Sequence, residues 1–279
     1  MIKALNLSFS YGKKKPQVFE NLSFSLDEGY VYGLLGKNGT GKSTLLYLLS
    51  GLLFPQHGQV LYKETDVRLR HPSTLQDLFL VPEEFALPNM SFRQYVKLNA
   101  PFYPRFSKEL LHNCLCDFEM NDDIHLGELS MGQKKKAFLC FALAANTSLL
   151  LMDEPSNGLD IPSKSQFRKV IASSMSDDKT MLISTHQVRD IDCLLDHLLI
   201  LDERQIILNE SVNSICDKLY FTEQAIGTET DAVLYSQPSV QGHSVILPNT
   251  EGRESNLNLE LLFNATLAEK EKIQSLFNR

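Results

Sequence analysis

The sequence has no tryptophan, few cysteines and no long uninterrupted apolar run. Its five cysteines are an odd number without a CxxC pair, which argues against a zinc ribbon or a disulfide framework and indicates reduced thiols of a cytoplasmic protein. Cys114-x-Cys116 lacks a second pair, so we interpret it as packing rather than as a metal site. The longest apolar runs, near 45–54 and 137–152, are short or interrupted by polar residues, so we expect no membrane span and no leader segment.

Positive charge is also scarce. Lysine and arginine number 27 against 34 aspartates and glutamates, which gives a formal net charge of −7. Surfaces that neutralise nucleic-acid phosphates are usually strongly basic, so we expect no nucleic-acid partner. With 279 residues, 43% of them hydrophobic, the chain is long enough for one large domain or for one domain with a small appendage.

Glycine, by contrast, is concentrated in GKNGTGKST, where Gly36, Gly39 and Gly41 separate an apolar run, 30–35, from a helix-compatible segment, 43–53. This pattern predicts a strand-to-helix turn. Glycines permit backbone angles closed to other residues, so successive N–H groups can surround a phosphate, and the N-terminus of the following helix adds partial positive charge. A flexible turn without a ligand is the alternative.

The spacing Gly-x4-Gly-Lys-Ser is that of a phosphate loop, which predicts binding of ATP with Mg²⁺. Lys42 would reach the β- and γ-phosphates, and the Ser43 hydroxyl would hold Mg²⁺. The predicted ATP-binding residues of the loop are Gly36, Lys37, Asn38, Gly39, Thr40, Gly41, Lys42, Ser43 and Thr44.

Downstream, the stretch ELSMGQKKKAFLCFALAANTSLLLMDEPSNGLD, residues 128–160, resembles the ABC ATPase family closely. The resemblance covers residues 1 to about 210. The family's elements appear in order as the signature Leu129–Gln133, the Walker B strand Leu149–Asp153 followed by Glu154, the D-loop Ser156–Asp160, and the H-loop LISTHQV with His186.

An apolar strand that ends in two acids supports this resemblance. The run 149–152 is typical of a parallel strand buried on both faces, and open α/β sheets collect ligands at the carboxyl ends of their strands. The resemblance implies that Asp153 holds the Mg²⁺ shell and that Glu154 acts as general base on the attacking water. A solvated turn at the end of the strand is the alternative.

Two further side chains receive roles from the resemblance. His186 ends another apolar strand and would contact the γ-phosphate, although a lone histidine is often structural. Tyr11 would stack on adenine. Its place in the alternation Leu5, Leu7, Phe9 allows core packing as the alternative.

The family's Q-loop glutamine, a Mg²⁺ ligand, is missing from FLVPEEFALPNMSF. By strand register Glu83 takes its place, and a carboxylate oxygen can ligate Mg²⁺ as well as an amide oxygen can. We therefore predict Glu83 as a metal ligand together with Ser43 and Asp153, with a surface acid of no ligand role as the alternative.

The signature also departs from the family, because Met131 replaces its first glycine. Ser130, Gly132 and Gln133 remain, and the resemblance places them in the ATP site of a second subunit. Three lysines, 134–136, follow in the first turns of the expected helix. We interpret them as solvated surface, with a raised positive potential near the nucleotide as the alternative.

The expected fold is a three-layer α/β phosphate-loop core with an antiparallel β portion near the N-terminus. The resemblance assigns residues 1–210 to the nucleotide-binding domain, with a helical subdomain at about 84–145. Residues 211–279 form a small α+β appendage with short strands and a closing helical region. The aromatic residues of the helical subdomain would form part of a groove for a membrane partner or cover its own core: Phe85, Phe102, Tyr103 and Phe106.

The resemblance implies an ATPase, the nucleotide-binding subunit of an ABC transporter, peripheral on the inner face of the cell membrane. Two ATPase subunits, identical or different, would close head-to-tail on ATP and drive transmembrane permease subunits on a separate chain. Glu83 and the short extension favour export over import. The alternatives are a soluble ABC ATPase working on nucleic acid or ribosomes, and a nucleotide-binding regulator without turnover.

Overall fold

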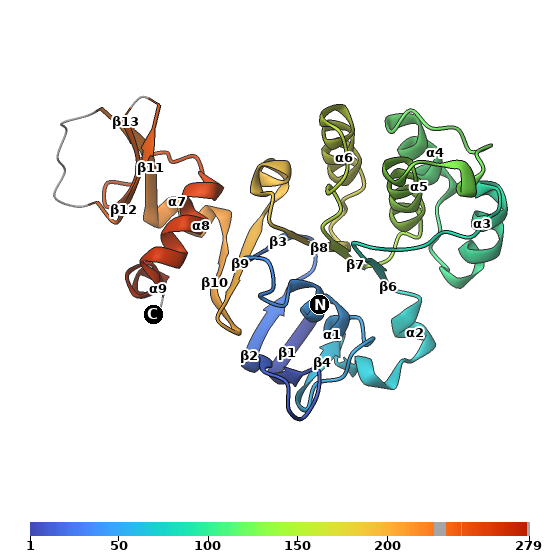
Figure 1. The fold of residues 1–279 in the computed structure, drawn as a ribbon, viewed down its shortest axis with the longest axis horizontal. Helices are drawn as coiled ribbons and strands as arrows, with labels where there is room; N and C mark the ends of the chain where they lie inside the picture. Colours follow the sequence, from blue (N-terminus) through green and yellow to red (C-terminus); the bar gives the residue numbers. More distant parts are fainter. Residues whose placement is uncertain (226–232, 241, 278–279) are drawn as a thin grey trace.

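The computed structural model describes residues 1–225, 233–240 and 242–277, and at its centre lies a six-stranded sheet in the order β10-β9-β3-β8-β7-β6 (Figure 1). Five of these strands run parallel, and β10 pairs antiparallel with β9. The strands are β3 (Val31–Leu35), β6 (Leu78–Val81), β7 (Leu149–Asp153), β8 (Thr180–Thr185), β9 (His197–Asp202) and β10 (Gln205–Ser211).

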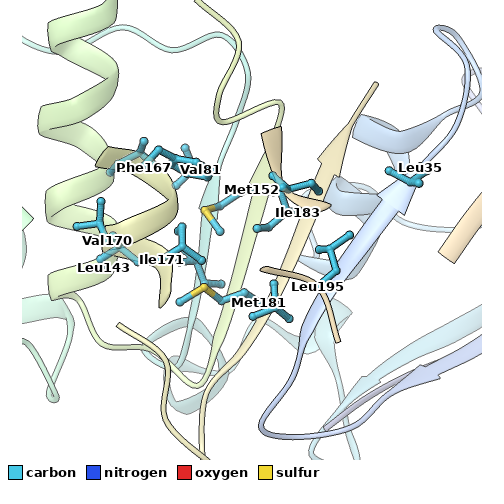
Figure 2. Close-up of a cluster of buried hydrophobic side chains, with 14 of the residues drawn as sticks. Leu35, Val81, Leu143, Met152, Phe167, Val170, Ile171, Met181, Ile183 and Leu195 are labelled. Atoms are coloured by element: carbon cyan, nitrogen blue, oxygen red, sulfur yellow. The ribbon is translucent and has the colours of Figure 1, made fainter. Parts of the chain in front are cut away.

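Both faces of this sheet are buried. Alternate residues of each strand point to opposite sides, and a separate apolar cluster covers each side. Leu150 and Met152 of β7 pack with α5 (Met131–Ala144) and α6 (Ile161–Ser173), as Figure 2 shows for Met152. Leu149 and Leu151 belong to a second cluster on the other face. The continuous apolar run that predicted a doubly covered strand is thereby confirmed.

The second cluster joins the central sheet to α1 (Lys42–Leu49) and to an antiparallel sheet of order β2-β1-β4-β5. The antiparallel β portion expected near the N-terminus is therefore present, and the core has three layers. Two short helices follow this sheet. The elements are β1 (Ile2–Ser10), β2 (Gln17–Leu26), β4 (His57–Tyr62), β5 (Thr65–Asp66), the 3₁₀ turn η1 (Val67–Leu69) and α2 (Pro72–Leu75).

Between β6 and β7 the chain forms the expected helical insert, to the right in Figure 1. Each main helix begins at a serine whose hydroxyl accepts the N–H of the third helical residue, since these first amides have no partner within the helix. The elements are α3 (Phe92–Asn99), η2 (Ala100–Phe102), α4 (Lys108–Asp117), η3 (Leu126–Glu128) and α5.

After β10, the described part of the chain forms a three-stranded antiparallel sheet with three helices, to the left in Figure 1. Its apolar residues, among them Ile246 and Leu262, belong to the same cluster as Ile207 and Leu208 of β10. The short strands predicted in this region, AVLYSQPSV at 232–240 and HSVILP at 243–248, overlap β12 and β13, although Ala232 lies outside the described residues. The elements are α7 (Val212–Lys218), β11 (Leu219–Gln224), β12 (Tyr235–Ser239), β13 (Gly242–Pro248), α8 (Leu259–Ala268) and α9 (Lys270–Phe277).

Candidate nucleotide-binding site

The glycine loop connects β3 to α1, as its sequence predicted. Gly41 is the N-cap of α1 with φ +103°, and a Cβ there would come within 2.6 Å of Val18 Cγ1. Only glycine adopts this conformation without strain. No side chain caps α1, so its first amides have no side-chain acceptor. Uncapped amides at a helix N-terminus form an anion site, and the loop is therefore suited to a phosphate.

Lys42 lies in this loop with 7% of its surface exposed. Its Nζ donates to the carbonyl oxygen of Gly36 at 2.8 Å and lies 3.9 Å from Glu154 Oε1. Burial lowers the pKa of Lys42, and the carboxylates of Glu154 and Asp153 oppose that shift. The ammonium group thus donates to neutral carbonyl oxygens of the loop, with the Glu154 carboxylate nearby, and an incoming phosphate can replace the carbonyl contacts.

Asp153, at the end of β7, is 1% exposed. Ser184 of β8 donates its hydroxyl to Asp153 Oδ1, whereas Oδ2 is buried without a hydrogen-bond partner. A buried carboxylate oxygen without a donor is costly, and it suits a cation. Across the described residues no group of three or more His, Cys, Asp or Glu could hold a metal ion alone. Proteins usually hold Mg²⁺ by one or two carboxylates together with substrate phosphates and water, and the Asp153 carboxylate fits that arrangement.

Glu154 is held from both sides of its carboxylate. His186 Nδ1 lies 2.9 Å from Oε1, and the Thr185 hydroxyl donates to Oε2 at 3.1 Å. The backbone of Glu154 has φ +45°, a left-handed conformation that is uncommon for a non-glycine residue. Because β7 and β8 end side by side, the structure brings Glu154, His186 and Lys42 together, as the sequence predicted.

Tyr11 does not continue the core face of β1, since 60% of its surface is exposed. Core packing was thus the wrong alternative. Its hydroxyl is 2.8 Å from Thr44 Oγ1, and its ring meets Phe9 edge-on at 5.0 Å. Tyr11, the loop residues 37–40 and Arg204 line a cavity of ≈ 680 Å³. The cavity adjoins the glycine loop and has room for a nucleoside; stacking of Tyr11 on adenine stays a prediction.

The signature residues form the N-terminus of α5. Ser130 Oγ accepts the N–H of Gln133, and Gln133 Oε1 accepts the N–H of Ser130, which makes a capping box. Met131 is 65% exposed. Gly132 faces the loop after β7, where a Cβ would come within 3.4 Å of Gly158 O. Within this chain the segment therefore presents an exposed helix N-terminus.

Glu83, predicted as a metal ligand, is exposed after β6 and accepts a hydrogen bond from Asn157 Nδ2 at 3.0 Å. The structure thus pairs it with the loop after β7, and its role as a ligand stays a prediction. Two residues were given no role from the sequence, Ser184 and Thr185. The sequence feature that could have identified them is their position as two polar residues at the end of an apolar strand.

Fold and site together define a phosphate-loop NTPase core, with the loop, two acids and a histidine gathered at one end of a parallel sheet. Comparison with known proteins gives the family. The profile of the ABC transporter family matches residues 19–157. The chain belongs to this family, the ATP-binding proteins of ABC transporters.

Three relatives illustrate the match. YtrB, an ABC transporter ATP-binding protein of Bacillus subtilis, is 23% identical over 88% of this chain and 86% of its own. The Nod factor export ATP-binding protein I of Burkholderia orbicola is 30% identical over 76% of this chain and 71% of its own. The zinc uptake system ATP-binding protein ZurA of Listeria innocua is 29% identical over 74% of this chain and 84% of its own.

The fold has solved counterparts. The ATP-binding cassette MJ0796, in a dimeric post-hydrolysis state with ADP and Pi, superposes with a TM-score of 0.66 over 76% of this chain and 99% of its own, at 23% identity. No helix among the residues that the structure describes is both long enough and apolar enough to span a bilayer.

Proposed function

We propose that this chain binds and hydrolyses Mg·ATP and drives transport through transmembrane subunits on a separate chain. The observation that carries the hydrolytic part is the buried Glu154 carboxylate, held by His186 and Thr185 beside Lys42. A binding protein without turnover has no need of a carboxylate oriented in this way next to the phosphate loop.

We infer a role in the reaction for each group of the site. The loop amides and Lys42 bind the β- and γ-phosphates, while Asp153 and Ser43 hold Mg²⁺. When bound, Mg²⁺ neutralises charge on the phosphate oxygens. Glu154 Oε1 or Oε2 accepts the proton of the attacking water. His186 keeps the carboxylate oriented toward that water and contacts the γ-phosphate. Tyr11 would stack on adenine, and Glu83 would be a further ligand of Mg²⁺.

The signature segment suggests how two subunits meet. The N-terminus of α5 is exposed at Met131 and carries Ser130 and Gly132, whose hydroxyl and amide suit a phosphate. We infer that it closes over the nucleotide of a second subunit, identical or different, in a head-to-tail dimer. ATP then binds chiefly to the closed pair, so that binding closes the dimer and hydrolysis opens it.

We propose that a membrane partner binds the helical insert. A cavity of ≈ 780 Å³ lies between α3 and α4, lined by apolar side chains such as Val96 and Phe106 with Arg93 at its rim. Of the four aromatic residues considered for this groove, Phe106 lines it and Phe102 is 66% exposed, whereas Tyr103 packs on Phe79 at 5.3 Å. The fourth, Phe85, packs on Phe138 with ring centroids 4.6 Å apart. The groove suits a short amphipathic helix of a permease.

For the organisation of the chain we propose a nucleotide-binding domain at 1–210, with its helical subdomain at about 84–145, and an accessory domain at 211–279. We propose a location on the inner face of the membrane through the partner. Export is favoured by the glutamate at position 83, and one relative is a Nod factor export protein. Another relative serves zinc uptake, so the direction of transport has to be measured.

The test is Mg²⁺-dependent phosphate release by the purified chain. The Kd for ATP is measured alongside in Lys42→Ala and Lys3→Ala. Lys3 is an exposed lysine of β1 and serves as the matched control. Lys42→Ala should raise the Kd for ATP at least about 100-fold, because it removes the ammonium that meets the phosphates. Unchanged affinity would contradict the phosphate-loop assignment. Copurification with an integral membrane protein separates a transporter subunit from a soluble ATPase acting on ribosomes or nucleic acid.

A further inference from the structure

Lys135, the middle of the three lysines that follow the signature, is buried. Only 4% of its surface is exposed, so the expectation of a solvated lysine is wrong at this position. Its Nζ donates to the carbonyl oxygens of Glu154, at 3.0 Å, and Asn157, at 2.8 Å. Two of the three ammonium protons thus go to the backbone that carries the predicted general base and the loop after it.

Both contacts act on an unusual stretch of backbone. Glu154 has a left-handed φ of +45°, and its N–H is held by the carbonyl oxygen of Ser184 at 3.0 Å. Its own carbonyl oxygen accepts from Lys135 and from the N–H of Asn157, the latter at 3.1 Å. A strained residue persists only where its surroundings hold it in place. Lys135 supplies the contact on the carbonyl side, opposite the one from β8.

Lys135 also belongs to the first turns of α5. Ser130 and Gln133, in the helix turn just before it, form the capping box, and Gly132 faces the carbonyl oxygen of Gly158. A displacement of this helix N-terminus therefore moves Lys135 with it, because the residues share one hydrogen-bonded turn. Asn157, the second acceptor of Lys135, in turn donates to Glu83 after β6. One buried ammonium group thus joins the signature segment to the backbone of Glu154.

We propose that Lys135 is a positioning residue that sets the orientation of Glu154 and couples it to the signature segment of the same chain. This inference rests on the proposed function. Contact of the signature segment with a second subunit's nucleotide then adjusts Glu154 through Lys135, so that each active site responds to the other. The buried charge is offset by the two carbonyl dipoles and by the nearby carboxylates of Glu83, Glu154 and Asp153.

The test replaces Lys135 by methionine, which keeps the length and removes the donors, and by glutamine, which retains an N–H₂ donor. Lys134→Met, one residue away and partly exposed, is the matched control. In Lys135→Met we expect kcat to fall at least about 10-fold, since small errors in the placement of a catalytic group are costly. The Kd for ATP should stay within about 2-fold, Lys135→Gln should recover part of kcat, and Lys134→Met should resemble the parent chain.

A second measurement does not depend on turnover. Amide exchange of residues 154–159 without nucleotide should be faster in Lys135→Met than in Lys134→Met, because the turn amide of Asn157 shares its acceptor with Lys135. Parent-like kcat in Lys135→Met overturns the inference, as does loss of kcat and ATP affinity together in both Lys135 variants. If the parent chain itself releases no phosphate, the proposed function fails, and unchanged exchange then overturns the role of Lys135 as well.

Discussion

Both ends of the central parallel sheet carry acidic residues that are at least partly buried, but the two ends differ in how many hydrogen bonds these acids accept. At the amino ends of β6 and β7, Asp77 accepts hydrogen bonds from four donors. These are Tyr62 Oη at 2.6 Å, Lys63 Nζ at 3.0 Å, Arg105 Nη2 at 3.0 Å and the N–H of Ser148 at 3.0 Å. Every strong acceptor position of this carboxylate is used, as is normal for a half-buried acid.

At the carboxyl ends one of the two acids, Asp153, is less completely satisfied, whereas both oxygens of Glu154 have partners. Asp153 Oδ2 has no partner although it is buried, and Glu154 holds a left-handed backbone. The helix N-terminus at Gly41 lacks a side-chain cap. Such features lower stability unless a ligand completes them, and they mark sites of binding and catalysis. The comparison suggests that a carboxylate with a full set of donors, such as Asp77, stabilises the fold, whereas a buried carboxylate oxygen without a donor, such as Asp153 Oδ2, lies where a ligand binds.

The largest expected effect is at the carboxyl end. Glu154→Gln removes the proton acceptor and keeps the shape, so kcat should fall about 10²- to 10⁴-fold while ATP still binds and the closed dimer accumulates. Phosphate release and size-exclusion chromatography with ATP measure both. Glu28→Gln, at an exposed turn, is the control. Rapid multiple turnover by Glu154→Gln would refute the assignment of the general base.

An intermediate effect is expected at the amino end, on stability instead of activity. Asp77→Asn should lower the free energy of unfolding by about 2 kcal/mol in urea titrations at pH 7, because it removes one of the two acceptor oxygens and leaves a buried donor, Tyr62 or Ser148, without its acceptor. ATP affinity should not change. Asp178→Asn, which removes a 67% exposed carboxylate bound to Arg105, should cost about 0.5 kcal/mol or less. A loss of ATP affinity in Asp77→Asn would abolish the contrast between the two ends.

The pH dependence of this loss has a definite sign. Burial raises the pKa of Asp77, but the hydrogen bonds from Tyr62, Ser148 and Lys63 outweigh it and set the pKa below the ordinary 3.8. An acid with a depressed pKa in the folded state stabilises the fold above its unfolded pKa and loses that contribution as the pH falls through the folded pKa. The difference between Asp77→Asn and the parent chain should therefore be complete above about pH 5 and shrink below pH 3.8.

The smallest effect is expected at Glu83, which is exposed and bound to Asn157. Glu83→Ala should raise the Mg²⁺ concentration for half-maximal phosphate release by about 3-fold, since Asp153 and Ser43 remain. Glu84→Ala, its exposed neighbour, is the control and should have no effect. An unchanged Mg²⁺ dependence in Glu83→Ala would remove Glu83 from the metal shell and make it a surface acid.

Much of the fold and part of the site could be predicted because they depend on local patterns. The run before Asp153 indicated a strand buried on both faces, and the glycine spacing predicted the turn into α1. The burial of Lys135 could not be predicted, since a lysine beside two others in a helix's first turn is usually solvated. Its acceptors belong to a loop 19 and 22 residues away, which only chain packing brings near.

The sequence by itself determined the class of protein, because the phosphate loop, the signature and the Asp-Glu pair carry their chemistry in residue type and short spacing. Only the tertiary structure decided which of the charged groups are satisfied. Parallel pairing of β7 with β8 lets the hydroxyl of Ser184 donate to Asp153 and that of Thr185 donate to Glu154. The packing of α5 brings the Nζ of Lys135 to the carbonyl oxygen of Glu154. The reason is physical: burial and hydrogen bonding depend on distances across the chain, and these are set by the packing of whole elements against one another.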